Sequence, residues 1–194
     1  MLIPGLPVAT SVLVLPGGTD NSTTPFSRRQ PAPMRMYPFT LSLRALPRVV
    51  VHQAVYDVHG WNGEHNSPLA PAQAALDHLI DRHPESPVIL VGHSMGGRVA
   101  AHLAADKRVA GVLALAPWWQ HADWEYIHGE ARVLALHGTA DQRTYSARTE
   151  KGITQLRERG VDAEFVPIEG GGHAMLDHVW TWQSTALTFV RSFL

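Results

Sequence analysis

The stretch Gly92-His93-Ser94-Met95-Gly96-Gly97 lies between the apolar run 87–91 (PVILV) and the alanine-rich segment 98–103 (RVAAHL). A β-branched run, a glycine-flanked serine and an amphipathic segment predict a strand, a sharp turn and a helix, which is the context in which G-x-S-x-G forms a nucleophile elbow. A strained backbone at Ser94 crowds the positions two before and two after it, so Gly92 and Gly96 lack a Cβ. We therefore expect the Ser94 hydroxyl at the carboxyl end of the strand, where backbone N–H groups at the helix N-terminus can hold an oxyanion.

Composition and charge limit the function classes. The 194 residues suffice for one domain, 1–194, with a sizeable core. A net charge of −1 gives no general attraction to nucleic acid or to an anionic membrane, and the lack of cysteine excludes disulfides and thiolate chemistry. The twelve histidines are scattered without zinc-type spacing, so we expect no metal and no cofactor. We expect no signal peptide and no membrane span, and a cytoplasmic location; the sequence does not indicate an oligomeric state.

The apolar patterns along the chain predict an α/β fold. Residues 21–38 are polar and rich in proline and are expected to form a long surface loop, before a short helical segment that Pro47 stops. Six strands alternating with helices predict a compact, doubly wound, mostly parallel sheet with helices on both faces and no substantial cap domain. The predicted strands are 11–15, 48–56, 87–91, 109–116, 131–136 and 161–168, and the later helices lie around 72–80, 98–103, 146–159 and 179–194.

An acid and a histidine follow two strands downstream of Ser94. Asp141 lies in the turn after the strand 131–136, and His173 lies in a glycine run after the last strand. Because reacting groups collect at the carboxyl ends of parallel strands, both can reach Ser94. The order Ser, Asp, His then predicts a catalytic triad in which His173 takes the Ser94 proton and Asp141 orients the imidazole.

Alternatives to this triad remain open on the sequence. Asp141 could cap the helix that follows it, and His173 could be an ordinary loop residue. The rival bases are His137 and His178, and the rival acids are Asp57 and Asp177. His93 points away from its neighbour in an elbow and is interpreted as structural.

With these motifs the chain resembles the α/β-hydrolase superfamily, and within it the small actinobacterial-type serine hydrolases loosely grouped with the dienelactone hydrolases. The resemblance rests on residues 92–97, 136–141 and 172–176, and more weakly on 35–39, 59–62 and 115–118. It implies an oxyanion hole made by the N–H of Met95 and an N–H of the loop after the first strand. The usual His-Gly there is Pro16-Gly17, so the match assigns Gly18, with Gly17 next. The family's true dienelactone hydrolases carry a cysteine nucleophile, and its dehalogenases an acid at the elbow; Ser94 departs from both.

The predicted activity is hydrolysis of small or medium carboxylic esters through an acyl-enzyme, with a small-molecule ester as the only partner. Thioester or amide hydrolysis is the alternative reaction, and a ligand-binding or interaction module is the alternative outside enzymes. The interval 117–130 is too short for a large cap but rich in aromatic residues, which either line a pocket or pack on the sheet. We interpret it as one wall of an open, apolar, shallow site, with the candidate pocket residues Trp61, Trp118, Trp119 and Met175.

Overall fold

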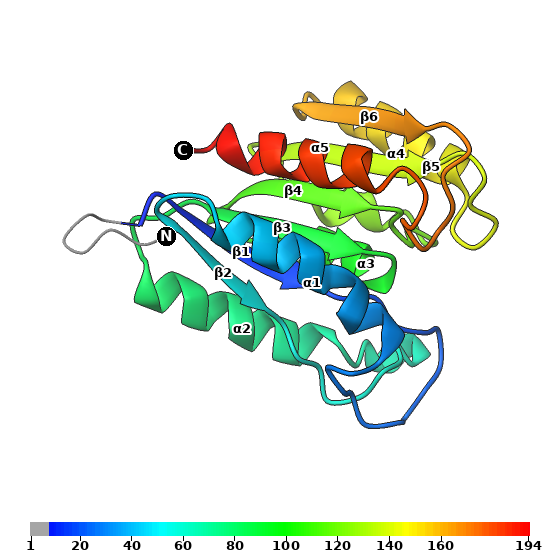
Figure 1. Cartoon of the computed structure of the whole chain (residues 1–194), viewed down its shortest axis with the longest axis horizontal. Helices are drawn as coiled ribbons and strands as arrows, with labels where there is room; N and C mark the ends of the chain where they lie inside the picture. The colour runs from blue at the N-terminus through cyan, green and yellow to red at the C-terminus, as the bar shows by residue number, and fades with distance from the viewer. Residues whose placement is uncertain (1–7) are drawn as a thin grey trace.

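Six parallel strands form the sheet in this computed structural model, which describes residues 8–194. The strands are β1 (Thr10–Leu15), β2 (Val49–Gln53), β3 (Val88–His93), β4 (Val109–Leu115), β5 (Arg132–Gly138) and β6 (Ala163–Ile168). They pair in the order β2-β1-β3-β4-β5-β6, and every pairing is parallel (Figure 1). The α/β fold and the six-stranded parallel sheet that the sequence predicts are therefore confirmed.

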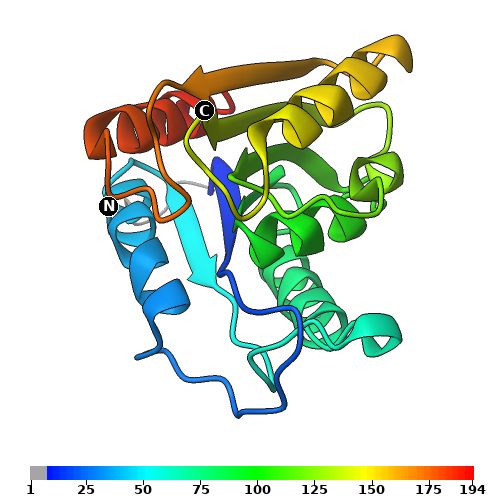
Figure 2. The same ribbon diagram turned by 90° about the vertical axis from the view of Figure 1, so that its right-hand side faces the viewer.

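Helices cover both faces of the sheet. Helices α1 (Pro31–Arg44) and α5 (Val179–Arg191) lie side by side on one face, as Figures 1 and 2 show. The other face carries α2 (Leu69–Arg82), α3 (Met95–Leu103), α4 (Ser146–Glu158) and the short 3₁₀ helix η2 (Asp123–Tyr126). A second 3₁₀ turn, η1 (Gly63–His65), precedes α2. Every residue of β1 and β3 is buried, as expected for strands covered on both faces.

The chain reverses its direction across the sheet between β1 and β3. From β1 it moves outward to β2, and it then crosses back through α2 to β3 on the other side of β1. Loops that leave adjacent strands in opposite directions open a crevice at the carboxyl edge of such a sheet. The loop after β1 and the turn after β3 meet at this crevice, which positions the functional site.

The predicted loop 21–38 was wrong in its second half, because α1 begins at Pro31. Pro31 and Pro33 lie in the first helical turn, where backbone N–H groups have no partner within the helix and proline costs little. Pro38 lies inside the helix and is exposed. The buried face of α1, with Met36, Phe39 and Leu43, packs on the same side of the sheet as α5 and stabilises the helix despite its prolines.

The ends of the second strand and of the last helix also differ from the predictions. The strand predicted to reach residue 56 ends at Gln53, and the chain then leaves the sheet so that Tyr56 donates a hydrogen bond to the carbonyl of Pro16 (3.1 Å). The last predicted helix, 179–194, ends earlier, at Arg191, and buries Trp182 and Phe189 while Val179 is exposed. Across residues 8–194, no helix is both long and apolar enough to cross a membrane.

Candidate active site

The turn at Ser94 joins β3 directly to α3. Ser94 has φ 56° and ψ −118°, a strained conformation for a residue other than glycine. A Cβ on Gly92 would lie 2.3 Å from the carbonyl oxygen of Gly96, and a Cβ on Gly96 would lie 1.9 Å from the carbonyl oxygen of Leu15. Both positions therefore require glycine for the turn to form.

Ser94, His173 and Asp141 are brought together at the carboxyl edge of the sheet. His173 Nε2 is 3.0 Å from Ser94 Oγ, and His173 Nδ1 is 2.7 Å from Asp141 Oδ2. Asp141 comes from the turn after β5 and His173 from the loop after β6. The Asp141 carboxylate is fully buried and the His173 ring is about one-tenth exposed. The proton on His173 Nδ1 therefore points at Asp141, which leaves Nε2 as the acceptor for the Ser94 hydroxyl.

The Asp141 carboxylate accepts hydrogen bonds from several further donors. Its Oδ2 atom accepts from His137 Nε2 (3.0 Å) and Thr144 Oγ1 (2.8 Å), and its Oδ1 atom accepts from the backbone N–H groups of Arg143 (2.7 Å) and Thr144 (3.2 Å). Burial by itself would raise the pKa of Asp141, but the hydrogen bonds from His137 and His173 outweigh it and bring the pKa well below its ordinary value. Asp141 is therefore ionised throughout the neutral range.

The rival residues do not reach Ser94. His137 is fully buried behind Asp141, and its Nδ1 atom lies 2.8 Å from Thr149 Oγ1. Asp57, Asp177 and His178 are exposed, and none of them shares a hydrogen bond with Ser94, Asp141 or His173 within the described residues. The residue that precedes α4 is Tyr145, so Asp141 does not cap that helix. The sequence analysis did not predict that His137 and Thr144 donate hydrogen bonds to Asp141. The spacing of four residues between His137 and Asp141 was a signal that the two side chains could meet.

His93 lies beneath the loop that carries His173. Its buried Nε2 is 2.9 Å from the carbonyl oxygen of His173, and the two rings are 5.0 Å apart between centroids. Burial, helped by the nearby positive charge of protonated His173, lowers the pKa of His93 to about 3. His93 is therefore neutral and donates its Nε2 hydrogen to that carbonyl, which fixes the backbone beside the His173 imidazole.

The buried neutral state of His93 predicts a pH-dependent stability. An unfolded histidine titrates near pH 6.5, whereas His93 in the fold titrates near 3. As the pH falls below 6.5 the unfolded chain binds a proton that the folded chain does not, so the free energy of unfolding falls. Between pH 7 and pH 5 this loss is about 2 kcal/mol.

Urea unfolding at pH 7 and pH 5 measures that loss. In His93→Gln the amide N–H can take over the hydrogen bond to the His173 carbonyl and no group titrates, so this variant should lose about 2 kcal/mol less than the wild type between the two pH values. Equal losses in the two proteins would contradict a buried neutral His93.

Two backbone N–H groups lie beside Ser94 without an acceptor. Neither Met95 nor Gly18 donates a backbone hydrogen bond to another residue in the range 8–194. A Cβ on Gly18 would lie 2.3 Å from the carbonyl oxygen of His59 and 2.5 Å from Met95 Cε, so the loop after β1 packs directly on the start of α3. Gly17 also approaches the nucleophile, because a Cβ there would lie 3.4 Å from Ser94 Cβ. Both predicted oxyanion donors, Met95 and Gly18, thus have a backbone N–H group that no other described residue uses.

The cavity at Ser94 has a volume of about 390 Å³ and is more polar than the predicted apolar site. Trp118 lines it and is held by a hydrogen bond from its Nε1 to Gln120 Oε1 (2.6 Å). Apart from Ser94, His173, Gly18 and these two residues, its lining consists of polar side chains: Thr19, Asp20, Arg143 and Thr144.

Three of the candidate pocket residues line other parts of the molecule. Trp119 is fully buried between α3 and η2, where its Nε1 donates to the carbonyl of Gly97 (3.1 Å). Trp61 lies under the Arg98 guanidinium (3.8 Å) in a separate cavity of about 380 Å³, and its ring meets Trp118 edge-on. Met175 packs in the core on the α1 and α5 side and lines a groove there. The sequence located these residues near strand ends, but the side-chain directions exclude them from the Ser94 cavity.

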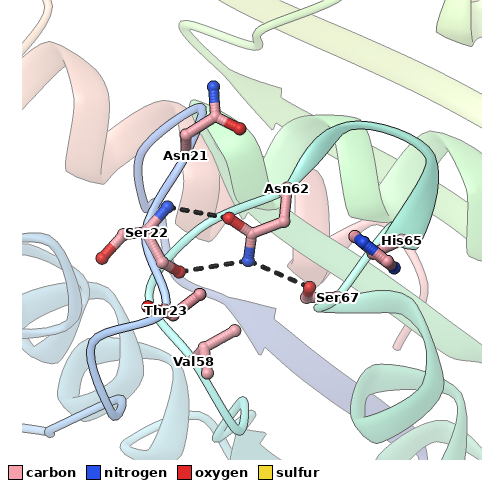
Figure 3. A pocket seen from close by; sticks show the side chains of 7 residues that line it. All are labelled: Asn21, Ser22, Thr23, Val58, Asn62, His65 and Ser67. Carbon is pink, nitrogen blue, oxygen red and sulfur yellow. Dashed lines mark hydrogen bonds between the residues drawn. The ribbon is translucent and has the colours of Figure 1, made fainter.

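A larger hollow of about 710 Å³ lies between the loops around residues 21 and 62 and does not include Ser94. Asn62 ties its walls together: it accepts from the backbone N–H of Ser22 (2.8 Å) and donates to the Ser22 carbonyl (3.1 Å) and to Ser67 Oγ (3.0 Å), as Figure 3 shows. No acid or activated nucleophile lines it. Its hydrogen bonds explain how the first half of the 21–38 segment is fixed to the protein.

Comparison with known proteins identifies the family. The model of the alpha/beta hydrolase family matches residues 68–180, which is more than half of the chain and includes Ser94, Asp141 and His173. The chain belongs to the alpha/beta hydrolase family. A model of the class 3 lipases also matches, over residues 19–114. Among curated proteins, the lipase LipV of Mycobacterium tuberculosis is 48% identical over 46 residues, a match that covers 23% of this alpha/beta hydrolase and only 18% of LipV.

Solved structures share the fold at low sequence identity. A serine hydrolase without a lid from Xanthomonas campestris has a TM-score of 0.76 and 16% identity, with 100% of this alpha/beta hydrolase and 87% of that chain covered. Est1E from Butyrivibrio proteoclasticus, solved with ferulic acid bound, has a TM-score of 0.72 and 13% identity over 94% and 88% of the two chains. A monoacylglycerol lipase of Paleococcus ferrophilus has a TM-score of 0.70 and 17% identity over 98% and 97%.

Within residues 8–194, no group of three or more His, Cys, Asp or Glu side chains is arranged to hold a metal ion.

Proposed function

We propose that this alpha/beta hydrolase cleaves small or medium carboxylic esters through an acyl-enzyme on Ser94. The observation that carries the proposal is the hydrogen-bonded chain from Ser94 Oγ through His173 to Asp141, at 3.0 Å and 2.7 Å, in a cavity open to solvent. A serine hydroxyl becomes a nucleophile when an oriented imidazole accepts its proton, and a buried carboxylate is the group that orients the imidazole.

The reaction follows from these positions. Ser94 Oγ attacks the ester carbonyl while its proton moves to His173 Nε2, and the oxyanion that forms accepts hydrogen bonds from the N–H groups of Met95 and Gly18. His173 then gives the proton to the departing alcohol, which leaves an acyl group on Ser94. A water molecule, deprotonated by His173, releases the acid and restores the serine. Asp141 remains ionised and keeps the Nδ1–H of His173 in place.

The comparisons support ester hydrolysis as the reaction class. The class 3 lipase model and the segment of LipV that matches both belong to lipases, and several proteins of the same fold are named as esterases or lipases. Thioesters and small amides pass through the same tetrahedral intermediate and form the second candidate class. We further propose that residues 1–194 act as one domain on a small-molecule substrate, without a cofactor.

A panel of short-chain esters, thioesters and amides with a common acyl group tests this function. We expect kcat/KM to be highest for the esters. A higher kcat/KM for the thioesters would assign the protein to the thioesterases. Binding of the substrates without turnover of any of them would contradict the hydrolase and favour a ligand-binding module.

The lack of a large cap predicts a preference for short and medium acyl chains. Residues 117–130 contain one short helix, η2, so no lid has to open at a lipid surface. Activity on p-nitrophenyl esters should peak at short to medium chains and show no increase above the micellar concentration of the substrate. A sharp increase there, or a preference for long acyl chains, would indicate a lipase with an interfacial mechanism.

Trp118 is the residue whose truncation should change this preference. Removing its ring enlarges the Ser94 cavity, and the apolar area lost is worth about 1–2 kcal/mol to an acyl chain that fits it. Trp118→Ala should therefore change the ratio of kcat/KM between butyrate and octanoate esters about tenfold. The matched control is Trp180→Ala, which removes an exposed tryptophan of α5 and should keep the wild-type ratio. A wild-type ratio in Trp118→Ala would remove the residue from the acyl site.

A further inference from the structure

Two arginines without an acidic partner line a small hollow beside the Ser94 and His173 pair. Arg35 comes from α1, and Arg143 comes from the loop between β5 and α4. Both line a hollow of about 160 Å³ that also includes Ser94 and His173. The arginines that form ion pairs within residues 8–194 are Arg98, Arg108 and Arg132; neither Arg35 nor Arg143 does so, and no side-chain hydrogen bond ties down either guanidinium.

The charges around this hollow favour an anion. Burial lowers the pKa of Arg35, and the nearby positive charge of Arg143 lowers it further, so the two guanidinium groups repel each other. The other titratable side chains that line the hollow are His59, His93 and His173, and none of them can supply a negative charge.

No described acid forms an ion pair with either arginine. The ionised Asp141 lies behind His173, where its oxygens accept hydrogen bonds from His137, His173 and backbone N–H groups. Asp20 lines the adjoining Ser94 cavity together with Arg143 but forms no ion pair with it. Arg143 is exposed, whereas Arg35 is partly buried and loses water without gaining an ion pair.

Other polar atoms at the hollow also lack partners. His59 lines the hollow and keeps a buried Nδ1 atom without a hydrogen bond. The backbone N–H group of Gly17, at its edge, donates to no other described residue. Buried polar groups normally find a partner, so these two beside the two arginines indicate a site for a ligand with acceptor atoms.

We propose that this hollow binds a carboxylate that the substrate carries in addition to the ester that is cleaved. The inference rests on the proposed function and narrows its substrate class to esters with a free carboxylate a few atoms from the ester carbonyl, such as half-esters of short dicarboxylic acids. Because Ser94 lines both the hollow and the larger Trp118 cavity, one substrate can present its ester to Ser94 and its carboxylate to Arg35 and Arg143. Arginine binds carboxylates through paired N–H donors, which gives orientation as well as affinity.

The test compares two substrates that differ only at the second carboxyl group. Monomethyl glutarate carries the free carboxylate, and in dimethyl glutarate a methyl group covers it; hydrolysis of both can be followed by titration of the acid released. We expect the wild type to have a higher kcat/KM for the monomethyl ester, through a lower KM. Added salt should reduce the preference, since it screens exposed charges.

Removal of one arginine should reduce this preference. A charge-assisted hydrogen bond contributes enough that Arg35→Gln or Arg143→Gln should lower the ratio of kcat/KM, monomethyl over dimethyl, roughly 10- to 100-fold. The matched control is Arg29→Gln, which removes an exposed arginine just before α1 that lines neither cavity, and which should keep the wild-type ratio. An unchanged ratio in both Arg35→Gln and Arg143→Gln would overturn the proposal.

A binding measurement separates this proposal from the proposed function. In Ser94→Ala, which cannot turn over substrate, calorimetry should detect glutarate binding, and Arg35→Gln added to that variant should weaken it at least tenfold. Glutarate binding in a protein that hydrolyses no ester would leave the carboxylate site standing and overturn the hydrolase. Hydrolysis of dimethyl glutarate without glutarate binding, or with binding of inorganic phosphate in its place, would overturn the carboxylate site and leave the hydrolase standing.

Discussion

Ser94→Ala is expected to lower kcat for ester hydrolysis roughly 10⁵- to 10⁶-fold. The hydroxyl is the atom that bonds to the substrate, and no other serine lies within hydrogen-bond distance of His173 in residues 8–194. The alanine side chain fits the same strained turn, so the circular dichroism and unfolding midpoint should stay close to the wild type. Rates with a p-nitrophenyl ester at saturation measure the loss.

A fluorophosphonate probe provides a second measurement of the same prediction. Such reagents react with activated serines, so the wild type should be labelled once, on Ser94, and Ser94→Ala not at all. The control is Ser67→Ala, whose hydroxyl bonds to Asn62 away from the candidate site; it should keep full activity and labelling. Labelling that persists in Ser94→Ala would assign the nucleophile to another residue.

Asp141→Asn should lower kcat about 10⁴-fold. In the wild type, Oδ2 accepts hydrogen bonds from His173, His137 and Thr144 at once. An asparagine either turns its NH₂ group toward these donors or turns it toward the two backbone N–H groups at Oδ1. In the first case His173 adopts the wrong tautomer for catalysis. In the second, the backbone N–H groups of Arg143 and Thr144 lose the oxygen that accepts their hydrogen bonds.

The additional hydrogen bonds to Asp141, beyond the one from His173, predict that Asp141→Asn also lowers the free energy of unfolding. Asp141→Asn leaves at least one buried donor unpaired, at a cost of about 1–3 kcal/mol in the free energy of unfolding. Asp57→Asn is the control, since Asp57 is exposed and follows β2; it should change neither activity nor stability appreciably. A stronger loss of activity in Asp57→Asn than in Asp141→Asn would move the acid to the loop after β2.

The sheet and its order of elements were accessible from the sequence because each strand is a short apolar run next to a turn signal. The segment around Pro31 was not, since three prolines within eight residues indicate a loop unless one knows that two of them fall in a first helical turn. The apolar face of α1 becomes stabilising only when it packs on the sheet at β2 and beside α5, partners that lie outside the segment itself. That residues 1–194 form one domain stays a prediction.

The residues of the candidate site could likewise be predicted from the sequence only in part. Ser94, Asp141 and His173 could be named because each follows a strand at the same edge of the sheet, and this placement does not depend on side-chain direction. Trp119 and Trp61 also follow strands, but their rings turn into the interior, which a sequence cannot reveal. Arg35 belongs to the weakly matching segment 35–39, but nothing in the sequence indicated that it and Arg143 line one hollow, since whether a charge is paired depends on residues distant in the sequence.

The close contact of Gly96 with Leu15 has a practical consequence for changing the substrate range. No side chain separates the start of α3 from the end of β1, so the nucleophile and the N–H groups of Met95 and Gly18 are fixed to one rigid block of backbone. Trp118, Gln120, Arg143 and Thr144 also line the Ser94 cavity, and they belong to loops outside that block. Libraries that randomise Trp118, Gln120 and Arg143 can therefore reshape recognition while the spacing between the attacking oxygen and its oxyanion donors is preserved.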